Sequence, residues 1–329
     1  MEKGMLSGFV KGVQEKKLGV LGAVLRQHGQ ILDTHEFVPS ERIQLFSASK
    51  SWTAMGVGIA IGEGLLSVTD RMVDLLRDEL PEKLPEGYDR LTVRHLLTMS
   101  TGHSECPIFK MQREEREKEL RENPEQNPDP GAGKRRGYAD LWFDAFMREP
   151  LTFDPDEGHF AYNNGTSYLL SRIVEKKAGM NLRDYLMPRL FTPLGIGDPQ
   201  WDCDSAGHTL GAIGLHLTTE ELSRGGQLLL QLGKWNGVQL IPEDYVREMT
   251  KKQVENAAPG GDPEACAGYG YQTWMCSRPG CYRMDGMFAQ FSVGIPDYDA
   301  VVGVTSHEPE RGFEILRLIW NEVLPKMEK

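Results

Sequence analysis

Short runs that suit β-strands lie near both ends of the chain. Residues 18–27 and 30–38 are two such runs, and the His28-Gly29 pair between them suits a tight turn, so together they predict a hairpin. Apolar spacing of helical period precedes and follows the strand-like runs, at 5–16 and 310–323. Further strand-like runs occupy 269–275, 281–284, 290–295 and 300–306.

The middle of the chain is helical in pattern. Apolar residues recur at helical spacing in 47–62, 70–80, 92–99, 137–148, 165–178, 181–190, 218–231 and 242–250. Strands at both ends with helices between them favour an α+β fold, in which the N-terminal hairpin and the C-terminal strands form one antiparallel sheet. We therefore predict a discontinuous sheet domain, residues 1–66 and 200–329, and an inserted all-helical domain, residues 67–199. A site is expected in a cleft between them.

Residues 108–136 differ from the rest of the helical domain. The charged run from Lys110 to Glu119 is typical of a solvated helix, and Pro- and Gly-rich sequence follows from Asn123 to Gly133. Two interpretations stay open. The segment is either a surface excursion or a lid over the site.

Composition narrows the class of protein. With 40% apolar and 26% charged residues among 329, the chain has the make-up of a globular protein. Its formal net charge of −11 argues against nucleic acid and anionic membranes as partners. The N-terminus lacks the pattern of a secretory signal, and the longest apolar run, Trp52 to Gly62, is too short to span a bilayer. We expect a cytoplasmic protein without a membrane partner; the oligomeric state is not indicated.

Metal and disulfide chemistry find no support in the sequence. The five cysteines include no Cys-x-x-Cys pair, and no His-Glu-x-x-His motif occurs. Cys276 and Cys281 are spaced to face each other across a hairpin, but two reduced thiols are the simpler interpretation. No metal, cofactor or disulfide framework is therefore expected.

Ser47 and Lys50 are the first candidates for chemistry. A helix places residues three apart on one face, where a serine can stand beside its base, and no other serine in the sequence is followed by lysine at that position. Residues 52–62 are apolar on nearly every helical face, so the helix is predicted to be buried. A lysine in a buried helix is costly unless it has a task or a partner. The alternative is a capping serine followed by a solvated lysine.

Tyr162 and Asn164 form a second candidate motif. A serine nucleophile needs a base, which can be a lysine whose pKa is lowered by burial or a tyrosine close to that lysine. Of the ten tyrosines, only Tyr162 has asparagine at the second following position. The alternative is a loop tyrosine before a helix, with Asn-Gly as ordinary turn chemistry.

The third requirement is an oxyanion hole made of backbone N–H groups. The N–H of Ser47, at the start of a helix, is one natural donor. Asp285-Gly286-Met287 lies between two strand-like runs, where Gly286 permits close approach to a substrate and the N–H of Met287 is a second donor. The alternative is that Asp285-Gly286 is simply the turn of a hairpin.

The three candidate motifs resemble, in chain order, those of the serine β-lactamase and penicillin-binding-protein superfamily. They are Ser47-x-x-Lys50, Tyr162-x-Asn164 and the segment at Gly286. Their spacing is most similar to the class C branch and its esterase and amidase relatives, 6-aminohexanoate-dimer hydrolase among them. The likeness extends over nearly the whole chain. Other segments that resemble this family are 94–103, 210–219 and 268–272.

This resemblance implies a five-stranded antiparallel sheet flanked by helices, with the all-helical domain inserted. It also implies roles. Ser47 is the acylated nucleophile, Lys50 its base or proton reservoir, and Tyr162 exchanges protons with Ser47 and the leaving group. Asn164 binds Lys50 and a substrate amide, while the N–H groups of Ser47 and Met287 form the oxyanion hole.

The third motif departs from the family pattern. Where β-lactamases and cell-wall peptidases usually carry Lys or His, then Thr, Ser or Gly, then Gly, this chain has Met284, Asp285 and Gly286. The groups that hold a substrate carboxylate are missing. As a hypothesis, Asp285 favours a substrate with an amine at that place, although Arg283 is near enough in sequence to cancel its charge.

The sequence thus predicts a serine hydrolase that forms an acyl-enzyme on Ser47 and cleaves a small ester or amide. Its substrate-binding residues are predicted to be Asn164, Asp285 and Gly286. One alternative is a true β-lactamase or D,D-peptidase, which the residue at 284 disfavours. The other is a catalytically silent binding protein on the same scaffold.

Overall fold

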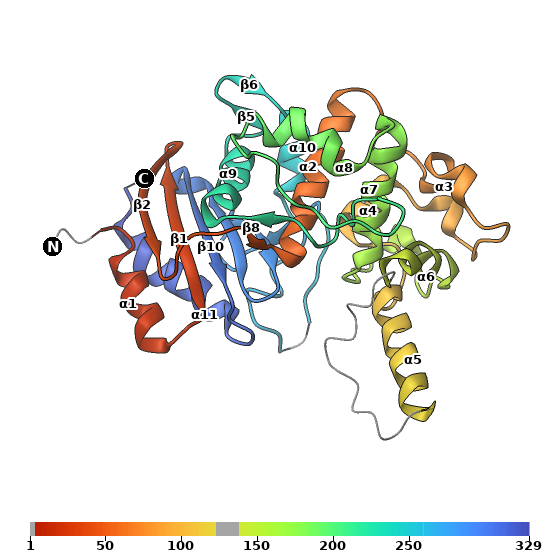
Figure 1. Ribbon diagram of the computed structural model, residues 1–329, viewed down its shortest axis with the longest axis horizontal. Helices are drawn as coiled ribbons and strands as arrows, with labels where there is room; N and C mark the ends of the chain where they lie inside the picture. The colour runs from red at the N-terminus through yellow and green to blue at the C-terminus, as the bar shows by residue number, and fades with distance from the viewer. Residues whose placement is uncertain (1–3, 123–137, 259, 329) are drawn as a thin grey trace.

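The main sheet joins the two ends of the chain. The computed structural model describes residues 4–122, 138–258 and 260–328. Six strands pair antiparallel in the order β2-β1-β10-β9-β8-β7 (Figure 1). This confirms the predicted α+β fold; the strand beyond the five that the resemblance implied is β7, two residues long. Bounds are β1 Val20–Gln27, β2 Gln30–Glu36, β7 Trp274–Met275, β8 Tyr282–Gly286, β9 Gln290–Ile295 and β10 Ala300–Ser306.

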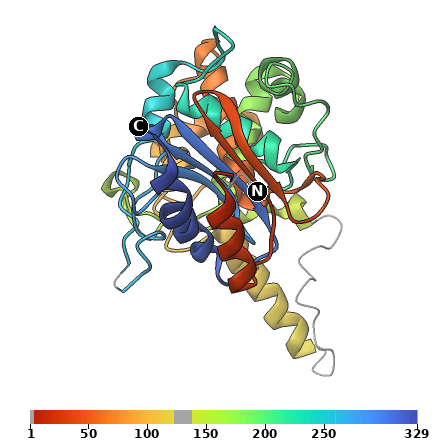
Figure 2. The same cartoon turned by 90° about the vertical axis from the view of Figure 1, so that its left-hand side faces the viewer.

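Helices cover both faces of this sheet. Leu25 in β1 faces an apolar layer formed with α1 (Ser7–Lys16) and α11 (Gly312–Leu318), which lie side by side in Figures 1 and 2. The next residue, Arg26, points to the other face and donates to Ser223 Oγ at 2.8 Å. Ser223 belongs to α9 (Thr219–Leu230), which begins at a capping box of Thr218 and Glu221. Because both faces are covered, β1, β9 and β10 are buried at nearly every position.

Helix α2 (Ser49–Gly62) lies at the centre of the helical part and is buried from Ser49 to Ala60, as its apolar faces predicted. It packs against α7, and its side chains share one core with those of α4 and α8. The remaining helices are α3 Met72–Leu75, α4 Val93–Thr98, α5 Pro107–Glu122, α6 Trp142–Arg148, α7 Asn164–Ala178, α8 Leu182–Leu186 and α10 Glu243–Met249. Two-residue strands pair as β3 Ile43–Gln44 with β4 His216–Leu217 and as β5 Lys234–Trp235 with β6 Val238–Gln239.

One predicted strand is much shorter than expected. The run 269–275 forms a ladder strand only at Trp274–Met275, and Tyr269 makes isolated bridges. Gln272 has a φ of 53°, in the left-handed region, which turns the backbone out of the extended conformation that a strand needs. The chain bends there, so the start of the run belongs to a loop.

The charged segment 108–136 is described in part. Residues up to 122 belong to α5, which projects from the body of the molecule in Figures 1 and 2. Residues 123–136 lie outside the described ranges, so the lid stays a prediction, as does the domain division at residues 66 and 199.

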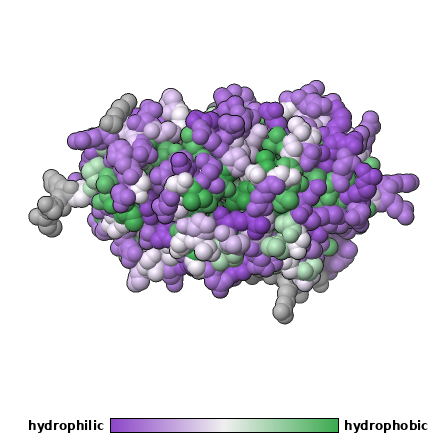
Figure 3. All heavy atoms as spheres, turned by 90° about the horizontal axis from the view of Figure 1, so that it is seen from above, coloured by the Kyte–Doolittle hydropathy of each residue, from purple (hydrophilic) through white to green (hydrophobic). Residues whose placement is uncertain are grey.

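In the part of the chain that is described, no helix has both the length and the apolar character to cross a membrane. From above, hydrophobic residues gather in a band across a mostly hydrophilic surface (Figure 3).

Candidate active site

The structure brings Ser47, Lys50 and Asn164 together. Ser47 lies in the short 3-10 turn Phe46–Ala48 that leads into α2, and Lys50 lies in the first turn of α2. The Lys50 Nζ atom is 3.1 Å from Ser47 Oγ, 2.7 Å from Asn164 Oδ1 and 2.9 Å from the carbonyl oxygen of Ala212. Asn164 is the first residue of α7, so the packing of α2 on α7 sets this geometry.

The environment of Lys50 favours its neutral form. The side chain is 1% exposed, and burial lowers its pKa from 10.5 to about 7. Its three hydrogen-bond partners are uncharged oxygens. A neutral amine has two N–H donors and one lone pair, so it can donate to Asn164 and Ala212 while its lone pair accepts from the Ser47 hydroxyl. That arrangement is what a general base for Ser47 requires.

Tyr162 completes the group. The centroid of its ring lies 5.0 Å from Lys50 Nζ. Burial raises the pKa of Tyr162, and the hydrogen bond that it makes with the Ser47 side chain opposes this rise. The phenol therefore carries its proton at neutral pH and lies within hydrogen-bond reach of the Ser47 side chain. Its ring packs against Trp274, with centroids 5.4 Å apart, and against Tyr269 at 6.3 Å.

Strand β8 approaches the nucleophile turn at Gly286. A β-carbon at Gly286 would collide with the carbonyl oxygen of Leu45 and lie 3.1 Å from the backbone nitrogen of Ala48. Only glycine allows this approach. The interpretation of Asp285-Gly286 as a hairpin turn is wrong. Both residues lie in β8, and the turn follows them at Phe288 and Ala289, which have φ values of 64° and 67°.

Met287 therefore directly follows the point where β8 meets the nucleophile turn. Its side chain is 62% exposed, and its carbonyl oxygen accepts from Gln290 Nε2 at 3.2 Å. An oxyanion hole needs a second N–H donor near the nucleophile, and the sequence assigned that donor to Met287. The role of Met287 in such a hole stays a prediction.

Asp285 is paired with Arg283. Arg283 Nε donates to Asp285 Oδ2 at 2.8 Å, and the remaining guanidinium groups donate to the carbonyl oxygens of Met275 and Glu264. Arg283 is buried, whereas 22% of the Asp285 side chain is exposed. Burial raises the pKa of Asp285, and the charge of Arg283 counteracts this. The guanidinium group of Arg283 therefore pairs with Asp285 and is not free to bind an anionic substrate.

Several features of the site carry no sequence motif. The Ala212 carbonyl that binds Lys50 is backbone, so no side chain signals it. Phe160 joins the aromatic wall, with its ring 5.1 Å from Tyr269 and 6.0 Å from Trp274. Periodicity does not indicate this grouping, because the rings come from a loop at 160–162 and from a second, distant segment at 269–274. Trp201, by contrast, packs on Phe191 in the core.

Within the described ranges, no cluster of three or more His, Cys, Asp or Glu side chains is placed to hold a metal ion. The cysteines that are described are all free thiols. Cys276 and Cys281 do face each other across the β7–β8 hairpin, with the N–H of Cys276 bonded to the carbonyl of Cys281 at 3.0 Å. The reactive side chains that the structure brings together here are those of Ser47, Lys50 and Tyr162.

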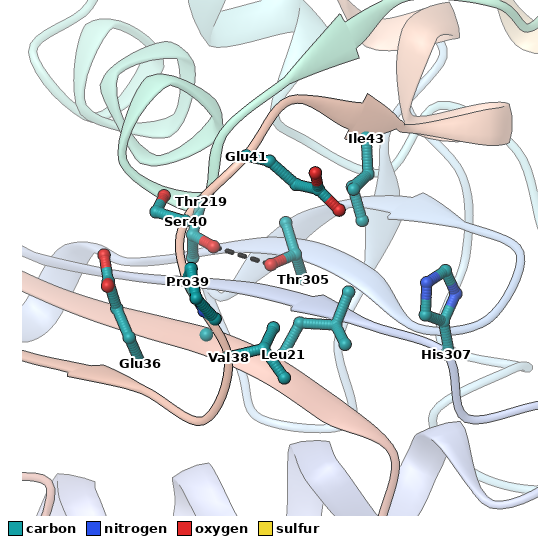
Figure 4. A pocket seen from close by; sticks show the side chains of 11 residues that line it. Leu21, Glu36, Val38, Pro39, Ser40, Glu41, Ile43, Thr219, Thr305 and His307 are labelled. Carbon is teal, nitrogen blue, oxygen red and sulfur yellow. Dashed lines mark hydrogen bonds between the residues drawn. The ribbon is translucent and has the colours of Figure 1, made fainter.

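A separate cavity of about 260 Å³ lies between one face of the sheet, at β2, β1 and β10, the segment 38–43 and the start of α9 (Figure 4). The hydrogen bond drawn there joins the hydroxyls of Thr219 and Thr305 at 2.6 Å. The described residues that line it do not include Ser47, Lys50 or Tyr162. The group of residues around Ser47 is therefore the candidate active site.

Comparison with known proteins relates this geometry to curated relatives. The chain is 25% identical over 241 residues to 6-aminohexanoate-dimer hydrolase of Paenarthrobacter ureafaciens, an alignment that covers 71% of this chain and 55% of that protein. It is 28% identical over 191 residues to a penicillin-binding protein of Bacillus subtilis (strain 168), covering 54% of this chain and 37% of that protein. The chain thus matches about half or less of the length of these relatives.

Solved structures and the family profile agree with these matches. The octameric penicillin-binding protein homologue from Pyrococcus abyssi is similar with a TM-score of 0.72 at 18% identity, over 98% of this chain and 77% of that chain. At that identity the likeness shows the fold alone. The profile of the Beta-lactamase family, however, matches residues 7–321, nearly the full length. The chain therefore belongs to the Beta-lactamase family.

Proposed function

We propose that this chain is a serine hydrolase that forms an acyl-enzyme on Ser47 and cleaves a small ester or amide. The observation that carries the proposal is the buried amine of Lys50, 3.1 Å from Ser47 Oγ, with its pKa lowered to about 7. A buried lysine bound only to neutral oxygens is costly in a fold that does not use it. A base poised near neutral pH is what activation of a serine hydroxyl needs.

The residues can divide the reaction among them. Neutral Lys50 takes the proton of Ser47 as Oγ attacks the carbonyl carbon, and the negative oxygen that forms is held by the N–H groups of Ser47 and Met287. Tyr162 gives its proton to the leaving alcohol or amine and is reprotonated from Lys50. Water then attacks the acyl carbon and releases the acid, with the same groups acting in reverse. The raised pKa of Tyr162 and the lowered pKa of Lys50 favour Lys50 as the first base.

The third motif bears on the substrate. Met284 is buried in the core, and Arg283 is committed to Asp285. A cation that would bind a substrate carboxylate is thus missing from this segment of β8, which argues against penicillins. Arg283 compensates the charge of Asp285, but the exposed part of this carboxylate can still accept a hydrogen bond from a substrate amine, such as that of an amino-acid amide. The name of one relative, a hydrolase of a 6-aminohexanoate dimer, fits an amide substrate.

The test of the proposed function is covalent labelling. Separate samples of purified protein are treated with a fluorophosphonate, whose adduct is read by mass, and with a panel of esters, amides and nitrocefin, whose turnover is measured. Wild type should gain one adduct that maps to Ser47, and Ser47→Ala should gain none. Hydrolysis of nitrocefin in preference to esters and amides would favour the β-lactamase alternative. Absence of any adduct on folded wild type would favour a silent binding protein.

Asp285 has its own test within that panel. Two amides of equal length, one ending in an ammonium group and one in a methyl group, are compared on wild type and Asp285→Asn. The ammonium substrate should lose about tenfold in kcat/KM, the scale of one exposed charge pair or slightly more, while the neutral substrate changes little. An equal loss on both substrates would remove the role assigned to Asp285.

A further inference from the structure

Gln272 lies where three parts of the candidate active site meet. Its side-chain Nε2 donates to the carbonyl oxygens of Leu96 and Leu97 at the end of α4, at 2.9 Å and 3.0 Å. Its Oε1 accepts from Ser167 Oγ in α7 at 2.5 Å, and its backbone carbonyl accepts from Ser51 Oγ in α2 at 2.6 Å. The residue is 2% exposed. One glutamine thus ties α2, α4 and α7 to the loop that leads into β7.

The points of attachment are next to the reacting groups. Ser51 directly follows Lys50, and Ser167 lies three residues after Asn164, on the same face of α7. The two serine hydroxyls therefore bind one residue from two helices. The distance between these helices decides whether Lys50 Nζ reaches Asn164 Oδ1, which it does at 2.7 Å. The hydrogen bonds of Gln272 with Ser51 and Ser167 link α2 to α7 close to Lys50 and Asn164, and so they hold the helices at that distance.

The backbone conformation of Gln272 is one that glycine adopts with less strain, so the glutamine side chain must contribute something that glycine lacks. Its φ of 53° lies in the left-handed region, where glycine is comfortable and a residue with a β-carbon is strained. Glycine would therefore satisfy the bend better than glutamine does. What glycine cannot supply is the amide that bonds Leu96, Leu97 and Ser167. These hydrogen bonds of the side-chain amide offset the backbone strain at Gln272.

We infer that Gln272 is a positioning residue, whose amide and carbonyl hold α2 against α7 so that Lys50 stays in line with Ser47 and Asn164. The residue contacts none of the reacting atoms and acts through Lys50. The inference rests on the proposed function, because it concerns the efficiency of the reaction at Ser47. It assigns a role to a position outside the three motifs, at the end of the segment 268–272.

Two variants separate positioning from general stability. Gln272→Gly removes the amide and relieves the strained φ, and Ser167→Ala removes only the bond to α7. Gln27→Ala is the matched control, because Gln27 is a buried glutamine in β1 whose Nε2 binds two backbone carbonyls, those of Tyr298 and Glu328. Each variant is measured for its thermal midpoint and for the rate of fluorophosphonate labelling of Ser47 between pH 5 and pH 9.

Gln272→Gly should label at least tenfold more slowly than wild type, because a displacement of about 1 Å can cost 100-fold. The midpoint of its pH profile should move upward from about 7, since a loosened Lys50 is better hydrated. Ser167→Ala should change in the same direction by less. The double variant should be no slower than Gln272→Gly, because the bond between the two residues is already lost. Gln27→Ala should keep the wild-type rate and profile whatever its thermal midpoint.

Wild-type rates and profiles in both Gln272→Gly and Ser167→Ala would overturn the inference while leaving the proposed function intact. If Gln272→Gly does not fold, Ser167→Ala decides alone. A folded wild type that is not labelled at Ser47 would overturn the proposed function first and the positioning role with it.

Discussion

Replacing Lys50 by methionine should make the stability of the fold respond differently to pH. Methionine has a similar length and no charge, so Lys50→Met removes the buried amine without opening a large cavity. In the wild type the folded state binds the Lys50 proton less tightly than the unfolded chain does, because burial lowers the pKa from 10.5 to about 7. Folding is therefore penalised wherever the unfolded lysine is protonated.

The size of this penalty follows from the two pKa values. Each unit between them corresponds to 1.36 kcal/mol, so the full penalty below pH 7 is about 5 kcal/mol. It declines as the pH rises above 7 and vanishes near 10.5. Between pH 6 and pH 9 the free energy of unfolding of wild type should rise by about 2.5 kcal/mol relative to Lys50→Met. The difference in the free energy of unfolding between the two proteins at a single pH is less informative. Lys50→Met also leaves Asn164 Oδ1 and the Ala212 carbonyl without a donor, which changes that difference at every pH.

The assay is urea denaturation of both proteins at pH 6, 7, 8 and 9. Subtracting one curve from the other cancels the titration of groups that they share. Lys11→Met serves as the control, because the Lys11 side chain is exposed and its loss should leave the pH dependence unchanged. A difference between wild type and Lys50→Met that stays constant over this range would refute the argument that Lys50 is held neutral by burial.

Three further outcomes are expected at the same site. The rate of Ser47 labelling in wild type should rise with pH through about 7 and level off above it, because only neutral Lys50 accepts a proton; a rate that falls across that range would exclude Lys50 as the base. Tyr162→Phe should lower kcat by about 100-fold or more while changing the free energy of unfolding by about 1 kcal/mol, measured by steady-state kinetics and urea denaturation. Gly286→Ala should slow labelling by about 100-fold, because its β-carbon would push β8 away from Leu45, whereas Gly197→Ala, with open space around it, should have no effect.

Much of the site was predictable because its side chains occur in short motifs. A helix places Ser47 beside Lys50 by its repeat alone, and the apolar residues after Lys50 predicted the burial that lowers its pKa. Asn164 was predictable only through the motif it shares with Tyr162, since its bond to Lys50 joins residues 114 apart in sequence.

The rest depends on backbone and on distant packing. The carbonyl of Ala212 has no signal of its own in a sequence, and a positive φ at Gln272 is not what its residue type predicts. Asp285-Gly286 has the composition of a hairpin turn, yet the close approach of β8 to Leu45 requires the glycine inside the strand. The turn was displaced to Phe288 and Ala289, which lack the residue types that usually mark one.

The pairing of β1 with β10 has a consequence for synthesis on the ribosome. Val24 lies opposite Gly303, so β1 is made long before β10, its partner on the inner side of the sheet. During that interval α2 and β1 expose the apolar surface that the later strands will cover. Exposed apolar surface of this kind makes nascent chains prone to aggregate. The nucleophile turn, too, meets β8 only once residue 286 has been added. Chaperone dependence and slow maturation should therefore accompany a sheet that is closed by its last strands.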